Sequence, residues 1–156
     1  LELLGGSATP MGFGDVYTAL QSQMLDGAEN NELALTDNGH GDICKYYSYT
    51  MHQMIPDILI GNLDFMEGLR EEERAIFDEG FQILNQTQRD AWETAVEEAK
   101  EKAENEQGVN FSYPDITPFQ EAVAPMHQEM LEEYPDLAPI YELIQEHNAE
   151  YPADSQ

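Results

Sequence analysis

The longest uninterrupted stretch of helix-favouring sequence runs from about residue 71 to about residue 107 and contains no proline. Apolar residues recur along it at helical spacing, which is typical of one apolar stripe on an amphipathic helix. These residues are Ala75, Phe77, Phe81, Leu84, Trp92, Ala95, Val96, Ala99 and Ala103. Glu, Gln and Lys fill the other face, and Gly108 is a natural stop. The sequence therefore predicts a single long helix, either continuous or broken once near residues 85–88.

Shorter elements are predicted on both sides of this helix. Residues 1–14 are rich in Gly, Ser, Thr and Pro and predict a loop, followed by a helix from Asp15 that Asp26 and Gly27 end. Residues 28–35 are compatible with a short loop or a strand. Further strands are predicted over residues 43–50, 55–60 and 109–113, and further helices over residues 117–133 and 138–148. The fold class is α/β, weighted toward helix.

The strongly negative charge of the chain limits the kinds of molecule that it can bind. The chain of 156 residues carries 32 acidic and 6 basic side chains, a formal net charge of −26. Such a surface repels phosphate backbones and anionic membranes, so neither nucleic acid nor a lipid surface is expected as a partner. No apolar run approaches the ~18 residues that span a bilayer, so no direct membrane insertion is expected either.

Motifs for metals, cofactors and catalysis are absent from the sequence. The four histidines are far apart and there is one cysteine, so no metal site is predicted. The histidines are His40, His52, His127 and His147, and the cysteine is Cys44. Gly12 and Gly14 lack the third glycine of a dinucleotide loop, so no cofactor is predicted. Carboxylates are so numerous that a close pair alone does not indicate a glycosidase, and no catalytic residue is predicted.

Residues 9–30, TPMGFGDVYTALQSQMLDGAEN, form the most informative stretch. It resembles a signature of the solute-binding proteins of tripartite ATP-independent periplasmic (TRAP) transporters, the dicarboxylate-binding subunit family. The similarity continues through Lys45, Tyr46, Ser48, Thr50 and His52 and covers nearly the whole chain. Two positions depart from the pattern: Asp15 replaces a glutamate, and Asn31 stands where a proline is common.

The resemblance implies a two-lobed fold of the periplasmic-binding-protein type, of which this chain is a helix-rich C-terminal fragment. Residues 1–51 would belong to the second lobe. Residues 52–156 would return to the first lobe, and the long helix would brace both.

The resemblance also implies a ligand site. Phe13 would pack on the bound ligand, Asn30 would hydrogen-bond its carboxylate, and His52 would lie in or near the polar network of the pocket. An Asn amide suits this role because it donates to a carboxylate without adding charge. The family's arginine, which grips the substrate carboxylate, lies upstream of this signature, and residues 1–52 contain no arginine. The chain alone is therefore expected to bind weakly or not at all.

The expected function is capture of a small organic acid outside the cytoplasm and its delivery to the membrane permease of a TRAP transporter. The resemblance implies a periplasmic or extracytoplasmic location, with a signal peptide or lipoprotein anchor in a missing N-terminal part. It implies no enzymatic activity. Two alternatives are an acidic helical protein-interaction module and a hydrolase or lyase that uses a carboxylate pair.

Overall fold

The computed structural model describes residues 1–151, which form two compact units. One unit spans Pro10–Pro114, and the other joins Leu1–Thr9 to the chain from Asp115 onward. The first unit contains α1 (Phe13–Gln21), α2 (Leu33–Asp37), the 3-10 turn η2 (His40–Asp42), β1 (Tyr46–Ser48), α3 (Leu63–Glu67), α4 (Glu71–Asn105) and β2 (Asn110–Ser112). The second contains η1 (Glu2–Leu4), α5 (Thr117–Glu133), η3 (Pro135–Leu137) and α6 (Ala138–Glu150).

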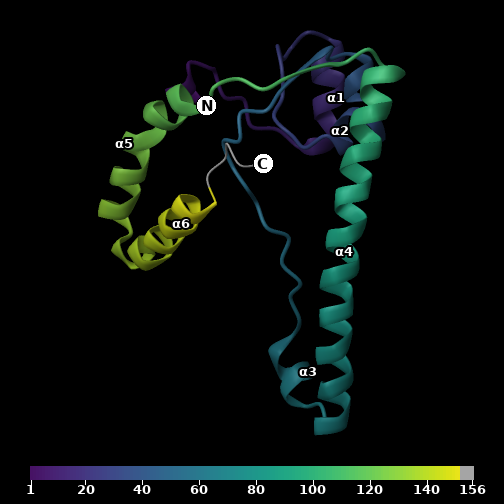
Figure 1. The fold of residues 1–156 in the computed structure, drawn as a ribbon, viewed down its shortest axis with the longest axis vertical. Helices are drawn as coiled ribbons and strands as arrows, with labels where there is room; N and C mark the ends of the chain where they lie inside the picture. The colour runs from purple at the N-terminus through teal and green to yellow at the C-terminus, as the bar shows by residue number, and fades with distance from the viewer. Residues whose placement is uncertain (152–156) are drawn as a thin grey trace. The chain divides into compact units, whose positions relative to one another are not determined.

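The long helix is confirmed as α4, and it is continuous rather than broken. Glu73 stabilises its start, because its carboxylate accepts a hydrogen bond from the Arg70 backbone N–H at 3.0 Å and pairs with the Arg70 guanidinium at 2.6 Å. Figure 1 shows α4 running from α3 at one end of the Pro10–Pro114 unit to α1 and α2 at the other. Within residues 1–151, no helix combines the length and the apolar character that crossing a bilayer requires.

Two of the three predicted strands form, and they pair with each other. β1 and β2 are parallel, with Tyr47 opposite Phe111, and α3 and α4 make the crossover between them. The third prediction, a strand over residues 55–60, is wrong for this structure, in which that segment has no regular secondary structure. A strand needs a neighbour for its backbone hydrogen bonds, and no neighbouring strand lies beside this segment in the described chain.

The predictions for the first 40 residues need two corrections. Helix α1 ends at Gln21 rather than at Asp26 and Gly27, because Gln23 takes a left-handed backbone conformation with φ 59°. Residues 28–35 were predicted as a loop or a strand. Residues 28–32 are a loop, the strand is wrong, and the helix α2, which was not predicted, begins at Leu33. The Asn31 side chain accepts a hydrogen bond from the Leu33 N–H at 3.1 Å.

The core of the Pro10–Pro114 unit lies where the last turns of α4 meet α2 and the strands. Leu35, Ala103 and Val109 are buried there, with Tyr47 and Phe111 packed against them. Ala103 has no exposed surface at all, so the helix backbone approaches its neighbours closely. This end of α4 is consequently the part of the helix that tertiary packing stabilises most.

The α5 and α6 helices match their predicted positions closely. α5 spans the predicted residues 117–133, with Pro118 in its first turn, and the Asp115 carboxylate accepts a hydrogen bond from the Thr117 N–H at 3.0 Å. α6 extends two residues beyond the predicted end. The rings of His127 and Tyr141 meet edge to face, 5.7 Å apart, and join the two helices.

Two glycine-to-alanine substitutions test the roles of Gly80 and Gly108. No described atom within 4 Å would obstruct a methyl group at Gly80, so Gly80→Ala should stabilise the chain by about 0.5–1 kcal/mol. Gly108 has φ +69°, so Gly108→Ala should destabilise it by about 1–2 kcal/mol. Urea unfolding followed by circular dichroism measures both, and a midpoint that falls for Gly80→Ala would contradict this account of α4.

Candidate functional site

Phe13 is the first residue of α1 and is partly exposed. Gly12 precedes it with an extended backbone, and the Gly12 carbonyl accepts the Asp15 N–H at 2.9 Å. Phe13 is 52% exposed, and the centroid of its ring lies 6.0 Å from the ring centroid of His40. Burial lowers the pKa of His40, so this neighbour is neutral near pH 7. The first turn of α1 therefore offers an aromatic surface beside free backbone N–H groups.

Asn30 lies on the exposed loop between α1 and α2. Its side-chain oxygen accepts a hydrogen bond from the Asn31 backbone N–H at 2.8 Å. Its backbone carbonyl accepts a hydrogen bond from the Tyr47 hydroxyl at 2.8 Å, which ties the loop to strand β1. The NH₂ group of Asn30 makes no hydrogen bond within residues 1–151, so the amide can offer a donor to a ligand.

His52 follows β1 and is connected to the same loop. Its Nδ1 lies 2.8 Å from the Thr50 hydroxyl, and its Nε2 lies 3.7 Å from a carboxylate oxygen of Glu29. The Gln53 amide donates to the same oxygen of Glu29 at 3.0 Å. Glu29 is the residue before Asn30, so this network joins His52 to the Asn30 loop.

The structure thus brings Asn30 and His52 to one neighbourhood, whereas Phe13 lies beside His40. No hydrogen bond, ion pair or ring contact within the described residues joins Phe13 to Asn30 or His52. The ligand-contacting roles of the three residues remain predictions. Two residues that support the loop, Glu29 and Tyr47, were not predicted, because only the fold shows that they contact it.

The basic side chain of the first 52 residues, Lys45, is already occupied by protein carbonyl groups. Its ammonium donates to the Gly41 carbonyl at 2.8 Å and to the Gln107 carbonyl at 2.7 Å. The Gln107 amide in turn donates to the Leu35 carbonyl at 3.0 Å. Lys45 therefore joins the turn after α2 to the end of α4 and is not free to grip an anionic ligand.

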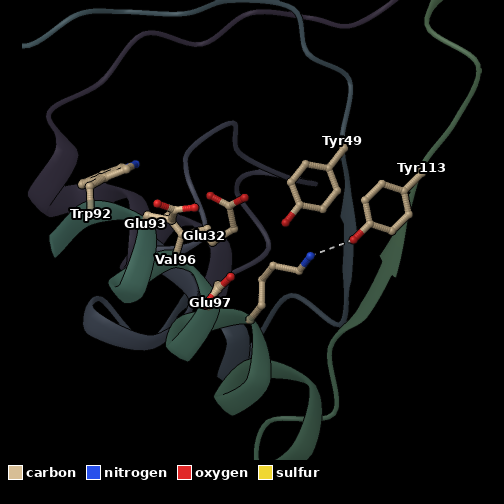
Figure 2. A pocket seen from close by; sticks show the side chains of 8 residues that line it. Glu32, Tyr49, Trp92, Glu93, Val96, Glu97 and Tyr113 are labelled. Carbon is tan, nitrogen blue, oxygen red and sulfur yellow. Dashed lines mark hydrogen bonds between the residues drawn. The ribbon is translucent and has the colours of Figure 1, made fainter. Parts of the chain in front are cut away.

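A hollow of about 520 Å³ lies between α4 and the strands, as Figure 2 shows. It is lined by Glu32, Tyr49, Trp92, Glu93, Val96, Glu97, Lys100 and Tyr113. Lys100 donates to the Tyr113 hydroxyl at 2.9 Å, and its ammonium lies 5.4 to 5.7 Å from the ring centres of Tyr49, Tyr113 and Phe111. The hydrogen bond to Tyr113 raises the pKa of Lys100.

This hollow does not suit an organic acid. Three glutamates line it against one lysine, so its formal charge is negative. The hydroxyl of Tyr49 is buried without a hydrogen-bond partner among the described residues, and burial raises the pKa of this tyrosine. Tyr49 and Tyr113 stack with ring centres 4.8 Å apart. The aromatic rings and Lys100 thus join α4 to the strands, which is a structural role.

No three His, Cys, Asp or Glu side chains in residues 1–151 gather in a way that could hold a metal ion.

Substitution of Tyr47 tests its support of the Asn30 loop. Burial, with the charges of Glu32 and Glu29, raises the pKa of Tyr47 to about 12. Because its pKa is higher in the folded state, the Tyr47 phenol stabilises the fold while it is neutral in both states, below about pH 10. This stabilisation is lost as the pH rises through about 12, where the phenol ionises in the folded state. Tyr47→Phe should lose about 1 kcal/mol at pH 8 and decline less than the wild type between pH 10 and 12.

Urea unfolding over pH 8–12 measures both effects, and Tyr46→Phe is the matched control because Tyr46 is 82% exposed. Equal alkaline profiles for Tyr47→Phe and the wild type would show that the hydroxyl does not support the loop.

Comparison with known proteins identifies relatives across most of the chain. A protein of Salmonella typhimurium, YiiZ, is 40% identical over 93% of this chain, which covers 44% of that protein. A solute-binding protein of Chromohalobacter salexigens is 33% identical over 94% of the chain, again covering 44% of the relative. The sialic acid-binding periplasmic protein SiaP of Vibrio cholerae is 29% identical over 82% of the chain, which covers 40% of it.

Solved structures show the same fold. A TRAP periplasmic solute-binding protein of Anaerococcus prevotii with bound D-glucuronate is 63% identical and matches 97% of this chain with a TM-score of 0.89. One from Chromohalobacter salexigens with bound D-glucuronate is 33% identical over 93% of the chain, with a TM-score of 0.88. This chain covers 49% and 48% of those two proteins. It therefore spans about half the length of the relatives that it matches.

These relatives confirm the expected fold class, in which this chain corresponds to about half of a periplasmic binding protein. They are solute-binding proteins of transporters and not enzymes, so the hydrolase alternative is wrong. Residues 1–134 match the family model of the bacterial extracellular solute-binding proteins, family 7. The chain belongs to this family, the solute-binding proteins of TRAP transporters.

Proposed function

We propose that this chain is part of a TRAP solute-binding protein whose ligand is a hexuronate such as D-glucuronate. The observation that carries the proposal is the 63% identity, over 97% of the chain, to a protein crystallised with bound D-glucuronate. A sugar acid has an apolar ring face and one carboxylate, so it needs an aromatic surface and hydrogen-bond donors. Phe13 would provide the aromatic surface, and Asn30 would provide a hydrogen-bond donor.

The proposed contacts follow from the local geometry. The NH₂ group of Asn30 would donate to the carboxylate, because an ionised carboxylate only accepts hydrogen bonds. The side-chain oxygen accepts the Asn31 N–H at 2.8 Å. The exposed ring of Phe13 would pack on the sugar ring. His52 would act through the polar network around Glu29, from which its Nε2 lies 3.7 Å away.

A charged anchor would come from the rest of the binding protein. The net charge of −26 opposes binding of an anion, and Lys45 is occupied by two carbonyl groups. An arginine fork is the usual strong partner for a carboxylate. We propose that the half of the relatives that this chain does not cover supplies it. The chain alone should then bind uronates weakly.

The lobe assignment is likewise a proposal. Residues 1–51 would lie in the second lobe, and the chain from His52 would cross to the first lobe through residues 53–62 and α3. The pairing of β2 with β1 adds one detail: α4 leads the chain back, so residues 110–112 rejoin the strand of residues 1–51. Closure of the two lobes on the acid would precede delivery to the membrane permease, in a periplasmic location.

Isothermal titration of a family-length protein tests the proposal. This chain can be joined to the remaining half of the Anaerococcus prevotii protein and titrated with D-glucuronate, D-galacturonate and D-glucose. The uronates should bind, and D-glucose should bind at least 100-fold more weakly because it lacks the carboxylate. Asn30→Ala should weaken uronate binding by about 1–3 kcal/mol, since a buried acceptor loses its donor.

Asn105→Ala is the matched control, because Asn105 is an exposed residue at the end of α4. An affinity that is unchanged by Asn30→Ala would remove Asn30 from the site. Equal binding of D-glucose and D-glucuronate would contradict the proposed ligand class.

A further inference from the structure

The exposed ring of Phe13 packs against the buried ring of His40. Phe13 is the first residue of α1 and is 52% exposed, whereas His40 is 5% exposed. The two ring centroids lie 6.0 Å apart with the planes tilted by 51°, which is within the range of a favourable aromatic contact. The contact with His40 therefore restricts the orientations that are open to the Phe13 ring.

His40 is held in place by the turn η2. Its carbonyl accepts the backbone N–H groups of Ile43 at 3.1 Å and of Cys44 at 2.8 Å. The centroid of its ring also lies 6.4 Å from that of Tyr17, which is one turn further along α1 than Phe13. Burial lowers the pKa of His40, so the neutral imidazole packs as a flat ring. His40 thus contacts the first turns of α1 through ring packing.

The turn η2 is itself attached to the core of the Pro10–Pro114 unit. The Gly41 carbonyl accepts a hydrogen bond from the Lys45 ammonium at 2.8 Å. A methyl group at Gly41 would lie 3.1 Å from the Leu35 carbonyl oxygen and would overlap the side chain of Gln107. The turn therefore links the beginning of α1 to α2 and to the chain that follows α4.

We propose that His40 is a positioning residue for the ligand: its ring holds Phe13 in the orientation in which Phe13 packs on a sugar ring. A side chain that is ordered before binding loses less conformational entropy when the ligand arrives. The inference rests on the proposed function, since it takes the Phe13 ring as a ligand-contacting surface. It adds a residue that lies outside the family signature of residues 9–30.

A double-mutant cycle tests the coupling between the two rings. D-glucuronate is titrated into this chain joined to the remaining half of the Anaerococcus prevotii protein, as the wild type, His40→Ala, Phe13→Ala and the double variant. His40→Ala should weaken binding by about 3- to 10-fold, the factor that corresponds to one aromatic contact. In the Phe13→Ala background the same change should have at most about a 2-fold effect, because the ring that His40 positions is gone. A merely structural role would weaken binding equally in both backgrounds.

Two further variants serve as rescue and control. His40→Phe should bind D-glucuronate within about 2-fold of the wild type, because it keeps a flat ring in the turn. His147→Ala is the matched control, since the His147 side chain on α6 is 62% exposed. Circular dichroism checks that each variant folds. If His40→Ala does not fold, His40→Leu, which fills the space without a flat ring, replaces it in the cycle.

A measurement without ligand separates this inference from the proposed function. A fluorinated phenylalanine in place of Phe13 reports the mobility of the ring by fluorine NMR. Its line should narrow in His40→Ala and keep its width in His40→Phe and His147→Ala. A wild type that binds no uronate would contradict the proposed function, and the fluorine line would still test His40. Equal line widths in the wild type and His40→Ala, or equal losses of affinity in both backgrounds, would overturn the role of His40.

Discussion

The close packing of the last turns of α4 against α2 and the chain around β2 holds the Pro10–Pro114 unit together. Ala103 is fully buried, and its small side chain lets the helix approach Leu35 and Val109. Ala99, one turn earlier in α4, is buried as well. Hydrogen bonds from Lys45 and Gln107 tie the same region to the turn after α2. The Asn30 loop depends on this packing, since Tyr47, which holds the loop, packs against the same cluster.

Charge shapes the proposed ligand chemistry as strongly as packing does. Four of the six basic side chains are engaged with carbonyl oxygens, a tyrosine or a carboxylate of the chain itself: Lys45, Arg70, Arg74 and Lys100. Lys45 is the one basic residue among residues 1–52, so near the Asn30 loop the proposed donor to an anion is a neutral group, the Asn30 amide. An acid-binding protein built this way needs its positive charge from another part of the molecule.

Local sequence patterns predicted α4, α5 and α6 well, whereas the short helices α2 and α3 were not predicted. The absence of proline from residues 71–107 and the proline at position 118 define α4 and α5 through local chemistry alone. The predictions failed where contacts with distant parts of the chain, or a single side-chain contact, determine the secondary structure. Residues 55–60 carry a strand pattern but lack a sheet neighbour in the described chain. α2 begins at Leu33, whose N–H donates to the Asn31 side chain, and no sequence pattern predicted this helix.

The candidate site was predictable only through the family signature. Phe13, Asn30 and His52 are individually ordinary residues, and no spacing rule links them. The supporting contacts of Glu29 and Tyr47 arise from pairings 17 to 24 residues apart, which only the fold reveals.

Hydrogen–deuterium exchange of the isolated chain, resolved by mass spectrometry, tests the central claim that stability is concentrated where α4 meets α2 and the strands. The account predicts the slowest exchange in residues 99–106 of α4, with β1 and β2 also protected. It predicts much faster exchange in residues 53–62 and in the first turns of α4. Uniform protection along α4, or slow exchange in residues 53–62, would contradict it.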